Sequence, residues 1–320
     1  MSSILIDRLS KGLGMAERDL QILIATGPNR YKTYRIPKRS GGYREIAQPA
    51  FELKLAQRLI IQEFLVDLPV HPCATAYKAG SSIRQNAERH SQNGPIMKFD
   101  FKNFFPSITE KAWLDYCAKK RLFDRVDAIR AARLLFRREK GSKVLRLSIG
   151  APSSPLLSNI LLYNFDDIVN RAVTDHKIVY TRYADDMTFS AERTWNLREV
   201  NGILRKAIRE IGTPHLIINE EKTVLATPKF HRQVTGLVLT LEKRVSIGRE
   251  RKRVIRSSVD HFRKGLLGPS DITKLAGTLS FIKDVEPEFF TRMERVYGAS
   301  VIKSIYEVSQ EYKTRKSRQK

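Results

Sequence analysis

The sequence predicts an α+β fold in which helices pack on an antiparallel sheet and a basic helical region follows. Two patterns support it. Short extended apolar runs, clearest at 96–99 and 177–191, are separated by longer stretches whose apolar residues recur every three or four positions. From about residue 249 the extended runs stop and the chain becomes helical and strongly basic. The 320 residues suffice for a large domain and a smaller one. We therefore expect an N-terminal helical segment (1–30), a central α+β body (31–245) and a basic helical region (246–320).

In the first half of the chain, the apolar spacing of residues 1–30 predicts two short helices. Two extended runs, 34–36 and 43–46, flank a glycine pair and predict a β-hairpin with a basic tip. The stretch 50–66 predicts an amphipathic helix. The apolar run after Pro95 predicts a strand that ends at Asp100.

In the second half, Thr109 is expected to start a helix and to cap it with its hydroxyl, and 125–138 predicts another. Pro152 suits the first turn of a long helix that reaches about residue 172. The later elements are strand, turn and strand over 177–191, a helix over 194–211 that ends at Gly212, short strands near 216–218, 223–226 and 233–240, and a disordered tail over 313–320.

The chain is very basic, with 58 Lys and Arg against 34 Asp and Glu, a net charge of +24 and a pI near 10.1. A polyanion is the usual partner of such a protein, and duplex nucleic acid carries about one charge per 1.7 Å of axis. An anionic membrane is the rival. However, no stretch approaches the roughly 20 apolar residues of a membrane span, and the N-terminus lacks the features of a secretion signal. We expect nucleic acid as partner and no membrane contact.

The only two cysteines, Cys73 and Cys117, have neither metal-ligand nor disulfide spacing. They indicate ordinary thiols in a reducing cytoplasm.

The strongest candidate for chemistry is the pair Asp185 and Asp186, which lies between two β-type runs. Adjacent carboxylates repel each other at low dielectric, and a divalent cation relieves that repulsion. The bare dipeptide is also common in surface turns. Asp100 likewise ends an apolar run, although a lone aspartate there is more often a capping residue. If the strands are neighbours, three carboxylates converge and can hold two metals about 3.5–4 Å apart, one activating an attacking hydroxyl and one steadying a leaving pyrophosphate.

Successive strand residues face opposite sides of a sheet. We therefore expect Asp100 and Asp185 to bridge the metals and Asp186 to contribute less directly.

Together, the three aspartates and the segments around them resemble the motifs of reverse transcriptases over about residues 30–240. The segment from Phe99 to Ile108 resembles the first catalytic motif. Gly150-Ala151-Pro152-Ser153-Ser154-Pro155, with Ser158 and Asn159, resembles the template- and nucleotide-positioning motif. Tyr183-Ala184-Asp185-Asp186 resembles the metal-binding hairpin.

Two further elements resemble those of bacterial retron enzymes. Asn86-Ala87-Glu88-Arg89-His90 is similar to the retron Asn-Ala-x-x-His element, and Val234-Thr235-Gly236 is similar to the Val-Thr-Gly element near the primer grip. A core-facing histidine and a β-bulge glycine are the plainer alternatives for His90 and Gly236.

The resemblance implies a right-hand polymerase, with fingers and palm to about residue 245 and a helical thumb after it. It implies that Arg44, with Lys38 or Arg39, grips the incoming triphosphate, since a guanidinium donates two hydrogen bonds to a phosphate at once. A solvated basic turn is the alternative. Phe105 would lie under the sugar and exclude a 2′-hydroxyl, with core packing as the alternative.

Further roles follow from the same resemblance. Lys222 would stabilise the leaving pyrophosphate or donate a proton to it, and an exposed turn lysine is the alternative. Phe101 is expected among the metal-binding residues, and Gly150 among the nucleotide-binding residues. Ile149 departs from the family, which usually has glutamine there, and this puts nucleotide contacts and fidelity in doubt.

The C-terminal region presents arginines at helical spacing, among them Arg249, Arg253 and Arg256. A charge run is usually a solvated face, but few acids balance this one, so it favours a thumb that binds a duplex or an RNA stem-loop. RNA stem-loops are recognised mainly through shape, phosphates and 2′-hydroxyls. With Asn86, His90 and Val234–Gly236, these arginines form the expected RNA- and primer-binding set.

The expected reaction is DNA synthesis from deoxynucleoside triphosphates on an RNA template with two Mg²⁺ ions, for which Mn²⁺ can substitute. The retron resemblance implies a cognate non-coding RNA, priming from a guanosine 2′-hydroxyl, multicopy single-stranded DNA as product, an effector protein and antiphage defence. No RNase H motif is evident, so a host RNase H would remove the template. The alternatives are a group II intron or diversity-generating reverse transcriptase, or a catalytically silent RNA-binding protein.

Overall fold

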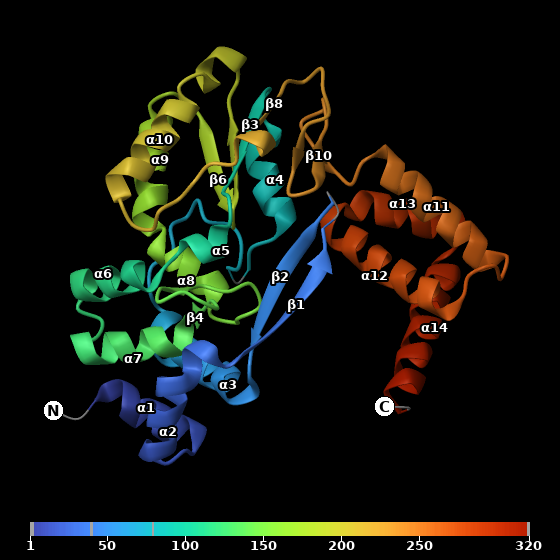
Figure 1. Ribbon diagram of the computed structural model, residues 1–320. Helices are drawn as coiled ribbons and strands as arrows, with labels where there is room; N and C mark the ends of the chain where they lie inside the picture. The colour runs from blue at the N-terminus through green and yellow to red at the C-terminus, as the bar shows by residue number, and fades with distance from the viewer. Residues whose placement is uncertain (1–2, 39–40, 79, 319–320) are drawn as a thin grey trace. The chain divides into compact units, whose positions relative to one another are not determined.

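The computed structural model describes residues 3–38, 41–78 and 80–318 and divides the chain into two compact units. The first comprises Met1–Ser81 and Ile96–Leu225, and the second comprises Ser82–Pro95 and Ala226–Lys320. The predicted limits of fingers, palm and thumb remain a prediction. The boundaries of the two compact units differ from these limits, because the segment 82–95 belongs with the C-terminal part of the chain (Figure 1).

The first unit is built on a four-stranded sheet whose strand order is β6, β7, β3 and β8. Strand β3 pairs antiparallel with β7, and β7 with β6, so the condition for the three aspartates to converge, that their strands are neighbours, is met. The register places Asp100 opposite Asp186. The strands are β3 (Ile96–Asp100), β6 (Val179–Tyr183), β7 (Asp186–Ser190) and β8 (Val224–Ala226).

Aromatic residues fill the core beside this sheet. Phe99 and Phe189 meet edge to face at 5.9 Å, and Tyr180 stacks on Phe189 at 4.8 Å. Helix α9 (Tyr163–Thr174) packs on β6, and α10 (Val200–Ile211) packs on α9 (Figure 1). The sheet is thereby covered on its apolar side.

The N-terminal part of this unit is a helical layer with a hairpin. The two predicted short helices are present, as is the amphipathic helix after the hairpin. The hairpin strands pair from Tyr31 with Pro49 to Pro37 with Tyr43. The elements are α1 (Ile4–Leu13), α2 (Glu17–Thr26), η1 (Gly27–Asn29), β1 (Tyr31–Pro37), β2 (Tyr43–Pro49), α3 (Phe51–Ile60) and η2 (Ile61–Leu65).

The remaining elements of the first unit connect the strands of the sheet along the chain. They are α5 (Phe104–Ser107), α6 (Glu110–Lys120), α7 (Arg125–Leu135), β4 (Arg137–Arg138), β5 (Leu145–Arg146), α8 (Ser154–Leu161), η3 (Thr194–Leu197) and η4 (Glu220–Lys222).

Five local predictions were wrong. The short strand predicted near 216–218 is only an isolated bridge between Ile218 and Phe101. Thr109 is the N-cap residue of α6, but its side chain makes no capping hydrogen bond. The long helix is two helices that meet at Leu162, and Pro155, not Pro152, lies in the first turn. Helix α7 ends before 137–138, which pair as strand. The tail is helical as far as Arg318, since α14 contains neither glycine nor proline.

The second unit joins a short helix from mid-chain to the C-terminal elements. Ser82 and Gln85 form a capping box that starts α4 (Ile83–Ser91), which packs on a three-stranded sheet in the order β11, β10 and β9. Arg232, 3% exposed, donates to the carbonyl oxygens of Asn93 at 2.6 Å and Thr240 at 2.9 Å. The elements are β9 (Gln233–Val234), β10 (Leu237–Leu239), β11 (Val245–Ser246), α11 (Arg249–Arg263), α12 (Pro269–Val285), α13 (Pro287–Tyr297) and α14 (Ala299–Arg318).

Both cysteines are free and buried. Burial raises the pKa of Cys117 to about 12, so its thiol is inert at neutral pH. Among the described residues, no helix combines the length and apolar character that crossing a bilayer requires.

Candidate active site

Three of the four predicted catalytic residues, Asp100, Asp185 and Lys222, line one cavity of about 1590 Å³ in the first unit. Asp100 enters it from the end of β3, Asp185 from the turn after β6, and Lys222 from η4. Lys38, Arg44 and Phe105 line the same cavity. Residues far apart in the sequence are therefore brought together around one space.

The turn that carries Asp185 is tight. Tyr183 pairs with Asp186, which leaves Ala184 and Asp185 as a two-residue hairpin turn. Ala184 has a φ of 58°, a conformation for which glycine is the usual residue. The main-chain N–H of Phe101 donates to the carbonyl oxygen of Asp185 at 3.2 Å and ties the turn to the end of β3.

Lysines balance the carboxylates at this edge of the sheet. Lys222 Nζ lies 3.0 Å from Oδ1 and 3.1 Å from Oδ2 of Asp100. Lys98 Nζ lies 2.9 Å from Oδ2 of Asp186. Asp186 therefore has its own partner, and it is not among the residues that line the cavity.

Burial raises the pKa of Asp185, and the neighbouring charge of Asp100 raises it further. Burial also raises the pKa of Asp186, against the opposing effect of Lys98. Both carboxylates are thus less favourable in their charged form than in water, the condition that a bound cation relieves.

The donor set of this site fits a divalent cation. Asp100 and Asp185 offer carboxylate oxygens, which Mg²⁺ prefers, on one cavity. Over residues 3–38, 41–78 and 80–318, no three histidine, cysteine, aspartate or glutamate side chains are already grouped as metal ligands. Asp186 is paired with Lys98 and Asp100 with Lys222.

The predicted nucleotide-binding residues are only partly described. Arg39 lies outside the described residues. Phe105 is flanked by aromatic rings, with the ring of Phe104 at 5.2 Å and that of Tyr77 at 6.5 Å. Both Phe104 and Phe105 line the cavity, but Phe104 is 4% exposed and packs in the core, whereas Phe105 is half-buried.

Gly150 lies behind the cavity wall, against the hairpin. Its φ is +115°, and a Cβ there would be 3.0 Å from both the Ala47 carbonyl oxygen and Ile46 Cγ2. Its neighbour Ile149 lines the cavity and accepts a 2.7 Å hydrogen bond from the Ala47 N–H. Glycine is therefore required here for close approach of two backbones.

Replacing Gly150 by alanine is expected to lower the free energy of unfolding by about 1–3 kcal/mol, because it adds both strain and overlap. Urea denaturation followed by circular dichroism measures the change. Gly202→Ala is the matched control, since nothing lies within 4 Å of its added Cβ on α10, and alanine there is expected to stabilise by up to about 1 kcal/mol. Equal stability of the two variants would contradict the packing argument.

The predicted RNA- and primer-binding residues all lie in the second unit. Asn86 and His90 are 1% and 0% exposed on α4, as in the core-facing alternative. Thr235 and Gly236 form the two-residue turn of the β9–β10 hairpin, with φ of 48° and 81°, so Gly236 is a turn glycine and not a bulge. Thr235 Oγ1 donates to the Ile83 carbonyl oxygen at 3.2 Å, which joins the two elements.

Helix α11 carries the predicted basic face. Arg249, Arg253 and Arg256 are exposed along it. The guanidinium of Arg256 also lies over the ring of Phe289, 5.4 Å from its centre. The other two arginines lie on the solvent side of the helix.

Sequence reasoning missed several residues of the site. Lys98 lies two positions before Asp100 on a strand, and this spacing alone places both on one face. Tyr77, which lines the cavity, has a φ of 60° that no sequence pattern indicates. Arg182 precedes the hairpin turn, but its buried partner Asp166 is visible only in the fold.

Comparisons with known proteins show the family of the chain. Residues 36–252 match the family model for reverse transcriptase (RNA-dependent DNA polymerase). The chain is 39% identical over 308 residues to the retron Ec83 reverse transcriptase of Escherichia coli, covering 93% of this chain and 97% of that protein. It is 31% identical over 307 residues to the retron Ec86 reverse transcriptase of Escherichia coli, covering 91% and 89%.

Among solved structures, apo telomerase from Candida tropicalis matches with a TM-score of 0.51 and 15% sequence identity. The match covers 90% of this chain and 58% of the telomerase chain, so it bears on the fold alone. With the family match, it confirms the predicted α+β right-hand polymerase fold.

The predicted family and activity are thus confirmed, with an RNA template and nucleotides as substrates. The chain belongs to the reverse transcriptase family, is an RNA-directed DNA polymerase, and groups within that family with the retron reverse transcriptases.

Proposed function

We propose that this enzyme copies part of a partner non-coding RNA into multicopy single-stranded DNA, a branched RNA–DNA molecule, by two-metal nucleotidyl transfer. The observation that carries the proposal is the meeting of Asp100 and Asp185 in one cavity of a chain whose relatives are retron enzymes. Priming would use the 2′-hydroxyl of a guanosine in the partner RNA.

At the catalytic edge, Asp100 and Asp185 would hold two Mg²⁺ ions, or Mn²⁺ in their place. Asp186 contributes less directly, since its carboxylate is bound to Lys98. Phe101 can contribute only through its main-chain oxygen, because a phenyl ring has no atom that binds Mg²⁺. When bound, the ions would activate the attacking hydroxyl and steady the leaving pyrophosphate.

The other residues of the cavity would act on the nucleotide. Lys222 supplies positive charge, or a proton, to the pyrophosphate. Lys38 and Arg44 bind the triphosphate from the hairpin tip. Phe105 lies under the sugar and disfavours a 2′-hydroxyl.

The second unit would bind the partner RNA. Thr235 and Gly236 offer a strained, partly exposed turn, and a β-branched residue at positive φ is a feature of functional sites. Arg249, Arg253 and Arg256 add charge for the phosphates. Asn86 and His90 would act indirectly, by supporting the turn, since they are buried in the helix on which it packs.

In this proposal the enzyme works in the cytoplasm with a host RNase H that removes the template, and serves antiphage defence together with an effector protein. The second candidate is another bacterial reverse transcriptase, from a group II intron or a diversity-generating element. The identity of 39% to a retron enzyme favours the first.

The proposal is tested on the nucleic acid that copurifies with the protein from its host. The expected finding is a small RNA joined to single-stranded DNA through a 2′–5′ bond, which a debranching enzyme separates. Linear RNA without attached DNA would contradict the retron function and leave the polymerase activity untouched.

A further inference from the structure

A fully buried ion pair lies directly behind the hairpin turn that carries Asp185. Arg182 on β6 and Asp166 on α9 are both 0% exposed. Arg182 Nε donates to Oδ1 of Asp166 at 2.8 Å, and Nη2 donates to Oδ2 at 2.6 Å. Tyr180 adds a hydroxyl that donates to Oδ1 of Asp166 at 2.8 Å.

The remaining nitrogen of the guanidinium reaches the catalytic turn. Arg182 Nη1 donates to the carbonyl oxygen of Ala184 at 3.1 Å and to Oδ1 of Asn159 at 3.2 Å. Ala184 is the residue with positive φ, directly before Asp185. Such a conformation persists only where its surroundings hold it in place, and the guanidinium is a rigid donor that does so.

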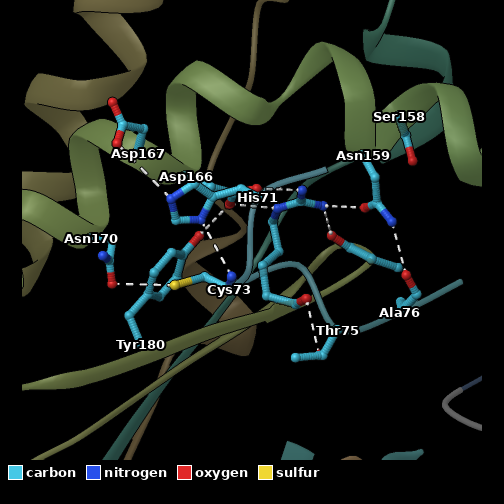
Figure 2. A network of polar contacts seen from close by, with 12 residues as sticks. His71, Cys73, Thr75, Ala76, Ser158, Asn159, Asp166, Asp167, Asn170 and Tyr180 are labelled. Carbon is cyan, nitrogen blue, oxygen red and sulfur yellow. Dashed lines mark hydrogen bonds and ion pairs between the residues drawn. The ribbon is translucent and has the colours of Figure 1, made fainter. Parts of the chain in front are cut away.

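The same residue also fixes the loop that leads to Tyr77. The Arg182 N–H donates to the Cys73 carbonyl oxygen at 2.7 Å, and the Arg182 carbonyl oxygen accepts from the Thr75 N–H at 2.9 Å. Asn159 Nδ2 donates to the Ala76 carbonyl oxygen at 2.8 Å. Figure 2 shows Asp166, Asn159, Tyr180 and Thr75 gathered around this buried site.

Stability alone is a weak reason for such a pair, because desolvation offsets much of the attraction between two buried charges. Here the guanidinium connects Asn159 on α8, Asp166 on α9 and the turn of Asp185, while the main chain of Arg182 pairs with the loop over 73–76. The turn that the guanidinium holds leads directly to Asp185, and the loop that Asn159 and the Arg182 main chain hold leads to Tyr77; both residues line the cavity. The contacts therefore set the geometry of the active site.

We propose that Arg182, held by Asp166 and Asn159, is a positioning residue that fixes the Asp185 turn, and with it the Asp185 carboxylate, for catalysis. The proposal rests on the proposed catalytic role of Asp185. A displacement of about 1 Å in a reacting group can lower a rate about 10²-fold, so loss of the guanidinium is expected to act on kcat and not on nucleotide binding.

The test compares variants in steady-state primer extension on an RNA template, with folding checked by circular dichroism. In Arg182→Met/Asp166→Leu the charges are removed together, so no uncompensated charge is left. We expect a fall in kcat of about 10²-fold with an unchanged KM for the nucleotide. Arg182→Lys keeps the charge but replaces the planar fork by a single ammonium, and is expected to lower kcat in the same direction.

Tyr180→Phe is the matched control, because it removes a buried hydrogen bond to the same Asp166 without touching the turn. We expect its kcat to stay at the wild-type value. If the double variant does not fold, Arg182→Lys decides. Wild-type kcat in the folded arginine variants, a loss confined to KM, or an equal loss in Tyr180→Phe would overturn the proposal.

Asp185→Asn in the same assay separates the two levels of the argument. An active Asp185→Asn enzyme would refute the proposed catalytic role itself. An inactive Asp185→Asn enzyme beside fully active, folded Arg182 variants would refute the positioning role alone.

Discussion

Replacing Asp185 by asparagine is expected to slow RNA-templated DNA synthesis by about 10³-fold or more with the fold retained. The carboxylate lines the same cavity as Asp100, and asparagine removes its charge while keeping its size. Metal ions supply several kcal/mol of transition-state stabilisation, and each 1.36 kcal/mol is about tenfold in rate. Single-turnover extension of a labelled primer with Mg²⁺ in excess measures the loss.

The control for Asp185→Asn is Asp115→Asn, which makes the same chemical change in an exposed ion pair with Lys111. We expect wild-type activity for it. A rate for Asp185→Asn within tenfold of wild type would show that Asp185 does not serve the chemistry.

The folding stability of Asp185→Asn, unlike its activity, is not expected to fall below that of the wild type. Because burial and Asp100 raise the pKa of Asp185 above 3.8, the native chain holds this proton more tightly than the unfolded chain. Stability linked to the group is therefore present below pH 3.8 and falls as pH rises through the raised value. In a chelating buffer at pH 7, Asp185→Asn is expected to unfold at no lower a urea concentration than wild type.

Removing one partner of the buried pair is expected to be the most destabilising single change. Asp166→Leu leaves the Arg182 guanidinium buried without its carboxylate, since both side chains are 0% exposed. The expected loss is about 3–5 kcal/mol in the free energy of unfolding, and adding Arg182→Met should recover most of it. Urea denaturation of the wild type, both single variants and the double variant measures the coupling energy.

An exposed pair provides the comparison for Asp166→Leu. Lys111 and Asp115 lie one turn apart on α6, with side chains 68% and 56% exposed. Asp115→Leu is expected to change the free energy of unfolding by about 0.5 kcal/mol or less. Similar losses at the two positions would mean that burial of the pair does not matter.

Local sequence patterns were sufficient for the catalytic hairpin. The extended apolar runs over 177–191 predict two strands, and both are present on either side of a two-residue turn. The convergence of Asp100 on that turn followed from the assumption that the two strands are neighbours, which the register confirms. The structure places Asp100 and Asp185 on one cavity. That these two bridge the metals, and that Asp186 contributes less directly, stays a prediction.

Long-range contacts were beyond the reach of these patterns. Asp166 is one polar residue on an amphipathic helix, and nothing near it in sequence indicates that it meets Arg182. Pro152 was a reasonable helix start, but Pro155 occupies the first turn because the helix begins at Ser154. A propensity shared by two nearby prolines cannot choose between them.

The placement of α4 in the second unit has a consequence for biosynthesis. Its partners β9 and β10 begin at Gln233 and Leu237, so at roughly 5–20 residues per second the helix waits on the order of ten seconds for them. Asn86 and His90, buried in the finished protein, lack the cover of these strands until then. A fragment that starts at Ala226 would lack the helix altogether, so the C-terminal unit cannot be obtained by a single cut of the chain.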